Sequence, residues 1–110
     1  MTTPVSFELH NLLKEKGFVC KESGSFWMNG FSYLKKNYNP ITYQDKDNVA
    51  TIAEVVMWLY EKHGIWIETC YWESDNCFQW KIRSIFSKES FNQPIETYEA
   101  AIEYTLNNLI

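Results

Sequence analysis

Basic side chains are scarce in this sequence, and only one of its 110 residues, Arg83, is an arginine. Ten lysine and arginine residues stand against 14 aspartate and glutamate residues, so the formal net charge is −4 at pH 7. Proteins that bind nucleic acid neutralise several phosphates with clustered lysine and arginine side chains. The chain offers the pair Lys35-Lys36 and otherwise scattered lysines. This composition argues against nucleic acid as a partner.

Long apolar runs are also missing. No segment is apolar over the length that a bilayer span requires. The first segment, MTTPVSFELHNLLKEKG, has an amphipathic pattern and lacks the apolar core of a secretory signal peptide. We therefore expect a cytoplasmic protein without a membrane partner. In a reducing compartment its cysteines, Cys20, Cys70 and Cys77, are expected to be free thiols, and none belongs to a C-x-x-C zinc motif.

Motifs for catalysis are absent from the sequence as well. It contains no glycine-rich phosphate loop, no HExxH motif and no nucleophile elbow. His63 falls in the last turn of a predicted helix, where a positive charge is favourable. The acid pairs Asp45/Asp47 and Glu73/Asp75 fall in predicted loops, where such residues commonly form turns. We therefore expect no enzymatic activity, no metal and no cofactor.

Apolar and aromatic residues are plentiful, at 45% and 17% of the chain. This content indicates a folded protein rather than a disordered one. A chain of this length is expected to form a single domain, residues 1–110, with one modest core.

Helix signals occur at three places along the chain. A threonine and a glutamate, Thr51 and Glu54, form a capping box before an apolar helical repeat. Glycines at positions 17 and 64 are typical of helix ends, and Pro94 is typical of a first turn. The predicted helices run from Thr3 or Ser6 to Gly17, from Thr51 to Gly64, and from Pro94 to the last residue.

Strand signals occur between the first two helices. We predict strands at 18–21 and 26–34 on either side of the turn at 23–25, with a bulge at Gly30. The polar segment 35–48 is predicted to be a loop that contains a short edge strand at 41–43.

A β-hairpin is predicted after the second helix, with strands 65–72 and 77–85 joined by a four-residue loop. This register gives one face an apolar set of cross-strand pairs and places Glu68 opposite Lys81 on the other face. It also sets Trp66 against Arg83 as a cation–π pair. A two-residue loop would keep the same faces and shift the partners. The apolar pairs are Ile67/Ile82, Thr69/Trp80 and Tyr71/Phe78. The predicted fold class is therefore α+β, with three helices and a mainly antiparallel sheet in the order α-β-β-α-β-β-α.

The polar face of this hairpin is the candidate binding site, because it combines Trp66, Trp72, Lys81 and Arg83. Tryptophan and arginine are frequent hot-spot residues of protein interfaces. The face is either open to solvent or covered by a helix, in which case the tryptophans belong to the core. A further tryptophan, Trp58, lies on the polar stripe of the second helix, either shielded by a loop or exposed as an anchor.

Three segments carry a resemblance to a known group: VSFELHNLLKEKGF, MWLYEKHGIWIE and YEAAIEYTLNNLI. In this order and spacing they resemble small uncharacterised proteins encoded by phages and prophages of gut Bacteroidota, with a layout similar to αβα sandwiches. The resemblance spans most of the chain, but its positions are helix caps and core residues. It implies a phage or mobile-element accessory protein acting in the cytoplasm of a bacterial host, without assigned catalytic residues.

Two functional hypotheses follow. The first is a non-enzymatic accessory protein that binds a host protein or a second copy of itself, such as a homodimer. The resemblance adds inhibition of host defence as its role. The alternative is a homo-oligomer that sequesters a nucleotide-like small ligand by aromatic stacking, with Lys81 and Arg83 holding the charged group.

Overall fold

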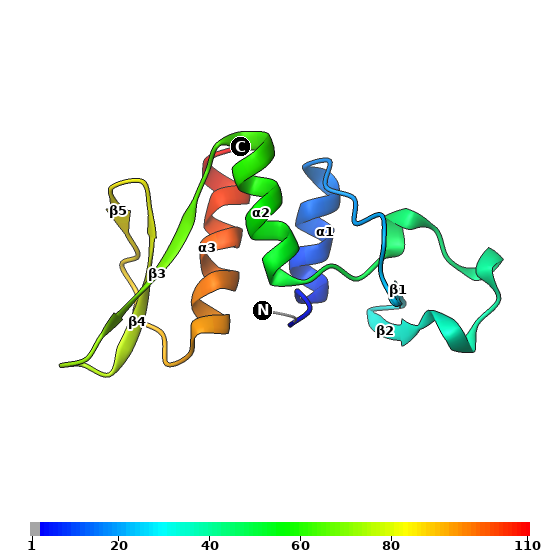
Figure 1. Ribbon diagram of the computed structural model, residues 1–110, viewed down its shortest axis with the longest axis horizontal. Helices are drawn as coiled ribbons and strands as arrows, with labels where there is room; N and C mark the ends of the chain where they lie inside the picture. The colour runs from blue at the N-terminus through cyan, green and yellow to red at the C-terminus, as the bar shows by residue number, and fades with distance from the viewer. Residues whose placement is uncertain (1–2) are drawn as a thin grey trace. The chain divides into compact units, whose positions relative to one another are not determined.

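The computed structural model (Figure 1) describes residues 3–110, which form two compact units, one up to Glu54 and one from Val55. The predicted α+β class is confirmed, since three helices accompany antiparallel sheets. The strands form a two-stranded sheet and a three-stranded sheet. The second sheet contains one strand more than predicted. The prediction of a single domain stays a prediction.

Helix α1 (Phe7–Glu15) begins and ends at the signals in the sequence. Of the two capping candidates, the structure selects Ser6, whose Oγ accepts a hydrogen bond from the Leu9 amide at 3.2 Å. At the other end, Gly17 has φ +87°. The amide of Phe18 then donates to the carbonyl of Leu13 at 3.0 Å. This is the hydrogen bond of a Schellman ending, and both residues are buried.

Strands β1 (Ser25–Met28) and β2 (Phe31–Leu34) form the first hairpin. The prediction of a strand at 18–21 is wrong, because both strands lie in the second predicted run. They are joined by Asn29 and Gly30, with φ values of 54° and 84°. Left-handed conformations at both central residues are typical of a tight two-residue hairpin turn. Gly30 is therefore part of a turn and not a bulge.

The segment after this hairpin is built from three short 3₁₀ turns rather than strands. They are η1 (Lys35–Asn37), η2 (Pro40–Thr42) and η3 (Asp45–Asp47). The predicted edge strand at 41–43 is wrong. Asn39 caps η2, because its side chain accepts a hydrogen bond from the Ile41 amide at 3.1 Å.

Helix α2 (Ile52–His63) begins at the predicted capping box. The Thr51 Oγ1 accepts from the Glu54 amide at 3.3 Å, and the Glu54 carboxylate accepts from the Thr51 amide at 3.2 Å. The helix ends at Gly64, which has φ +66°. Its boundaries are therefore set by residues within one turn of each end.

The second sheet has the order β3-β4-β5, with β3 (Ile67–Trp72), β4 (Cys77–Ile82) and β5 (Ile85–Phe86). The predicted register of the first pair is confirmed at every ladder position, from Ile67↔Ile82 to Trp72↔Cys77. The predicted length of the second strand is wrong. Arg83 has φ 59°, so β4 ends at Ile82 and the chain turns back to form β5.

Helix α3 (Pro94–Asn108) packs on one face of β3 and β4, as Figure 1 shows. The fully buried residues of this helix include small residues in addition to Ile102 and Leu106. The ring of Tyr104 lies 4.7 Å from that of Trp80 in the sheet. Small side chains let the helix approach the sheet closely, and each threonine hydroxyl donates to a carbonyl four residues earlier. These small residues are Thr97, Ala101 and Thr105.

Within residues 3–110, no helix combines the length and the apolar character that crossing a membrane requires.

Candidate functional site

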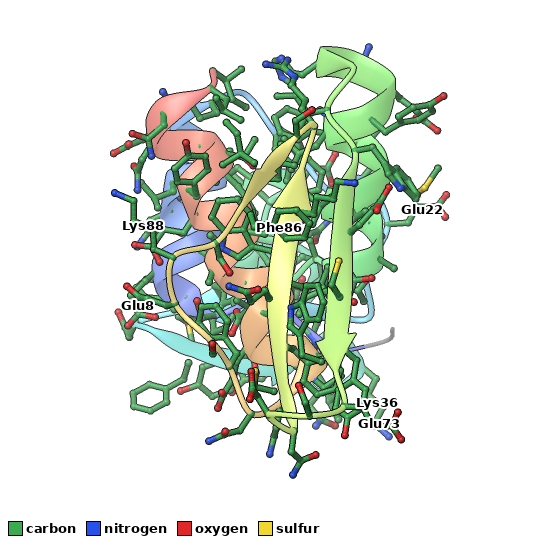
Figure 2. The ribbon with its side chains drawn as sticks, turned by 90° about the vertical axis from the view of Figure 1, so that its left-hand side faces the viewer. Glu8, Glu22, Lys36, Glu73, Phe86 and Lys88 are labelled. Atoms are coloured by element: carbon green, nitrogen blue, oxygen red, sulfur yellow. The ribbon has the colours of Figure 1, made fainter. Side chains whose placement is uncertain are left out.

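One face of the second sheet is left without a covering element of its own unit. Side-chain alternation places α3 against the face that carries Ile67, Trp80 and Ile82, all buried. The opposite face is turned to the viewer in Figure 2. We call it the open sheet face. Its side chains are Glu68, Cys70 and Trp72 from β3, Cys77, Gln79 and Lys81 from β4, and Phe86 from β5.

A chain of hydrogen bonds runs across the open sheet face. The Trp72 indole Nε1 donates to Gln79 Oε1 at 2.8 Å, and Gln79 Nε2 donates to the carbonyl oxygen of Ser87 at 2.8 Å. Ser87 is itself buried. The indole of Trp72 is therefore held in one orientation while 44% of the residue stays exposed. Trp72 thus presents an exposed aromatic surface with a defined hydrogen-bond partner.

Phe86 extends this aromatic surface. Its ring centroid lies 6.3 Å from that of Trp72, and the Lys81 ammonium lies 5.6 Å from the Phe86 ring. Phe86 is 43% exposed. Phe86 was not among the predicted site residues, because its place on this face depends on the turn at Arg83. The apolar pair Ile85-Phe86 is the local sequence signal for β5. A pair is too short to show whether it begins a new strand or continues β4.

The predicted site residues are only partly brought together. Trp72 and Lys81 share the open sheet face. Arg83 lies in the turn between β4 and β5, so the predicted cross-strand pair with Trp66 is wrong. The Trp66 ring instead meets the ring of Tyr60 edge-on, with centroids 5.5 Å apart. Trp66 is 46% exposed and precedes the first residue of β3.

Trp58 does not belong to the open sheet face. It lies on α2, where its ring meets that of His63 edge-on, with centroids 4.9 Å apart. It is half-buried, so it is neither fully shielded nor a free anchor. The candidate site therefore consists of Trp72, Lys81 and Phe86. Trp66 lies just before the first residue of β3.

No protein-family model, no curated protein and no solved structure matched this chain.

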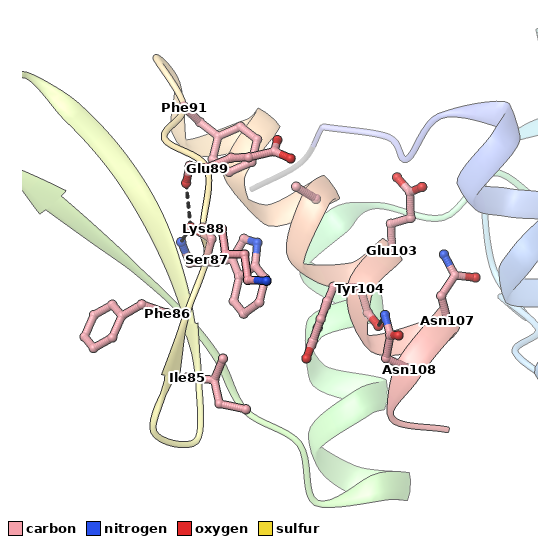
Figure 3. Close-up of a pocket in the computed structure, with 12 residues that line it drawn as sticks. Ile85, Phe86, Ser87, Lys88, Glu89, Phe91, Glu103, Tyr104, Asn107 and Asn108 are labelled. Atoms are coloured by element: carbon pink, nitrogen blue, oxygen red, sulfur yellow. Dashed lines mark hydrogen bonds between the residues drawn. The ribbon is translucent and has the colours of Figure 1, made fainter.

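A surface pocket in the second unit lies on the other side of β5 from this face (Figure 3). Its volume is about 480 Å³. Residues 85–89 and Phe91 form one wall, where the Ser87 hydroxyl donates to the carbonyl oxygen of Glu89 at 2.7 Å. Tyr104, Glu103 and Asn107 line it from α3, and Figure 3 shows Phe86 pointing away from it. Lys81 and Arg83 do not line this pocket, so it is not the ligand site of the alternative hypothesis.

The first unit contains one histidine whose surroundings are mainly aromatic. His10 is buried beside the rings of Phe7 and Trp27, at centroid distances of 6.2 and 5.8 Å. Burial, with a smaller effect of the charge on Lys14, holds its pKa below the usual value, so it is neutral at pH 7. Within residues 3–110, no group of three or more His, Cys, Asp or Glu side chains is placed to hold a metal ion.

The three free cysteines have different surroundings. Cys20 is buried in the first unit, where its thiol donates to the Glu54 carboxylate at 3.0 Å. Burial first, and the bond to Glu54 second, raise the pKa of the Cys20 thiol to about 11. Cys70 and Cys77 are half-buried on the open sheet face. Since the thiolate is the reactive species, Cys20 is expected to be the least reactive of the three.

We predict that Cys70 and Cys77 are alkylated before Cys20 when dilute native protein is treated with iodoacetamide near pH 8. The raised pKa alone lowers the thiolate fraction of Cys20 by about a hundredfold relative to an ordinary thiol. Peptide mass spectrometry after short pulses gives the three rates. In a Cys70→Ser, Cys77→Ser variant, labelling should be slow until denaturant is added. Equal rates at all three sites would show that the open sheet face is covered or that Cys20 is accessible.

Proposed function

We propose that this protein is a non-enzymatic binding protein that holds a partner protein against the open sheet face. The observation that carries the proposal is the state of Trp72, which is exposed by 44% and held by the hydrogen bond to Gln79. An anchor already fixed in its bound orientation loses little conformational freedom on association, so more of its contact energy remains as affinity.

The chemistry of the face suits a protein surface. Trp72 and Phe86 together offer an aromatic patch, and Lys81 lies beside it over the Phe86 ring. Aromatic residues surrounded by polar ones are typical of the energetically dominant part of an interface. Glu68 lies directly across from Lys81 in the sheet. The partner is therefore expected to present an apolar side chain to the aromatic patch, with polar groups around it for this charged pair.

The resemblance to phage-encoded proteins supports a partner class as well. A small accessory protein of a phage acts on components of the bacterial cell that carries it. We therefore propose a protein of the bacterial host as the partner, and inhibition of a host defence component as the outcome of binding.

The test is affinity capture from a lysate of the native host, with wild-type protein compared with a Trp72→Ala, Phe86→Ala variant. Loss of two hot-spot side chains should weaken binding by at least about 30-fold, which removes the partner from the eluate. Phe31→Ala is the matched control, since Phe31 is an aromatic residue exposed by 67% outside the face.

Thermal melts separate binding from folding in the same experiment. The face variant should stay folded with a cooperative melt, because Trp72 and Phe86 are 44% and 43% exposed and neither belongs to the buried core. Lys81→Glu gives a second variant that reverses charge without removing an aromatic side chain. Capture of the same partner by wild-type protein and by both variants would rule out the open sheet face as the binding surface.

A further inference from the structure

The outer edge of β3 carries backbone groups that no other strand pairs. The sheet order β3-β4-β5 places β3 at one margin. The far side of β4 is occupied, because Phe78 exchanges two hydrogen bonds with Phe91, at 2.7 and 2.8 Å. The carbonyl of Trp80 likewise accepts from the Ser87 amide at 2.9 Å.

Alternation along the ladder then identifies the outward groups of β3. The backbone groups of Phe78 and Trp80 point away from β3. Those of the alternate residues Cys77, Gln79 and Lys81 therefore point toward β3. The residues of β3 in register with these three are Trp72, Cys70 and Glu68, so these are the residues that bond to β4. The amides and carbonyls that point outward belong to Ile67, Thr69 and Tyr71. No backbone hydrogen bond from residues 3–110 reaches them from outside the sheet.

Most devices that normally prevent edge pairing are missing from β3. Natural sheets guard exposed edges with proline, lysine, bulges or very short strands. This strand has the sequence IETCYW, which contains none of these residues, and pairs with β4 over six residues without a bulge. Its one charge, Glu68, lies across from Lys81 of its own sheet. The edge is therefore open and carries no like-charge barrier of its own.

We propose that β3 pairs antiparallel with β3 of a second copy of this chain, about a twofold axis at Thr69. In this register Thr69 pairs with Thr69 of the second copy, and Ile67 pairs with Tyr71 of the second copy. All three outward residues then find partners that also point outward, which is the condition for exchanging backbone hydrogen bonds. This pairing joins the two three-stranded sheets into one continuous sheet.

Side chains and charges select this register over its neighbours. It places Glu68 beside Cys70 of the second copy and Trp66 beside Trp72 of the second copy. An axis at Glu68 would set two carboxylates directly opposite each other, which is destabilising. An axis at Cys70 would place Ile67 against Glu73 in the loop of the second copy and leave fewer backbone groups paired. The axis at Thr69 thus pairs the most backbone groups while keeping like charges apart.

This dimer interface is formed by the edge of β3, so the dimer does not depend on whether a partner protein binds the open sheet face. It places the two open sheet faces side by side on the same surface of the joined sheet. A partner bound to one face would then meet the matching aromatic patch of the second copy.

Sedimentation equilibrium over a series of protein concentrations tests the proposal. We expect a concentration-dependent dimer for the wild type. The Thr69 amide of each copy donates one hydrogen bond across the axis, so Thr69→Pro removes both bonds of this pair. Proline is tolerated on edge strands. The substitution should raise the dimer dissociation constant by at least about tenfold, since two hydrogen bonds are lost. Thr69→Ser keeps the amide and should dimerise like the wild type. A wild type that stays monomeric throughout would overturn the proposal.

Disulfide trapping identifies the register and does not depend on the folding of the proline variant. In a Cys77→Ser background, Glu68→Cys places its thiol opposite the native Cys70 of the second copy, in a non-hydrogen-bonded pair. Such pairs have Cα atoms about 4.5 Å apart, which is within disulfide reach. Oxidation should give a covalent dimer.

Two matched controls distinguish the competing registers. Adding Cys70→Ser to the Glu68→Cys variant should abolish the covalent dimer, whereas an axis at Glu68 would preserve it. The Cys77→Ser background alone should not cross-link, whereas an axis at Cys70 would join the two native thiols. Absence of a covalent dimer from Glu68→Cys, or equal yields from it and either control, would contradict pairing about Thr69.

Discussion

Truncation of the chain after Glu103 is expected to unfold the second unit. The removed segment contains Tyr104, which lies against Trp80, and both Thr105 and Leu106 are fully buried. Loss of one buried leucine side chain alone costs about 2–5 kcal/mol, and the truncation removes more than that. A domain of this size is typically stable by only about 5–15 kcal/mol. Chemical denaturation followed by circular dichroism should show the midpoint shifted down or the transition lost.

Point substitutions in the same turn of α3 provide the controls. Leu106→Ala should lower the free energy of unfolding by about 2–5 kcal/mol, because Leu106 is fully buried and its removal leaves a cavity in the core. The neighbouring Asn107 is exposed, so Asn107→Ala should change stability by no more than about 0.5 kcal/mol. A truncated protein with an unchanged midpoint would show that the last turns of α3 are dispensable.

Phe26→Ala is expected to lower the stability of the first unit by about 3–5 kcal/mol. Phe26 is 1% exposed and is the centre of an aromatic cluster in the hairpin and the 3₁₀ segment. Its ring centroid lies 6.0 Å from Tyr33, 5.3 Å from Tyr38 and 4.9 Å from Tyr43. The segment 35–47 is built from short 3₁₀ turns, and the ring contacts of Tyr38 and Tyr43 with Phe26 attach it to β1.

The control for this substitution lies in the same hairpin. Phe31 is 67% exposed, so Phe31→Ala should leave the midpoint of unfolding nearly unchanged. Indole signals in two-dimensional NMR report each unit, because Trp27 is the one tryptophan before Glu54. Selective broadening or loss of the Trp27 signal in Phe26→Ala would locate the damage in the first unit. Equal stability of the two phenylalanine variants would contradict the role given to Phe26.

The helices and the β3–β4 register were predictable because their signals are local. Ser6, Gly17 and the Thr51–Glu54 pair act within one turn of the helix ends that they set. The hairpin register follows from the two-residue alternation of strands and from a short loop, and a shift by one residue would have buried Lys81. These elements required no knowledge of what packs against them.

The strand errors arose where two local signals competed. Both the Ser-Gly-Ser run at 23–25 and Asn29-Gly30 are turn signals, and Asn-Gly is the stronger hairpin signal of the two. At the end of β4, nothing in the sequence marks a turn. Arg83 adopts a left-handed conformation that residues with a Cβ rarely take, and glycine or asparagine would have been expected there.

The sequence by itself determined the helix ends, the pairing of β3 with β4, and the separation of apolar from polar side chains on that pair. Tertiary structure alone decided that α3 covers the apolar face and that β5 adds Phe86 beside Trp72 and Lys81. The physical reason is the sequence separation of the residues that interact. Caps and alternation depend on residues a few positions apart, whereas an open face and an unpaired edge depend on which distant segments pack nearby. The candidate site became visible only when both kinds of information were combined.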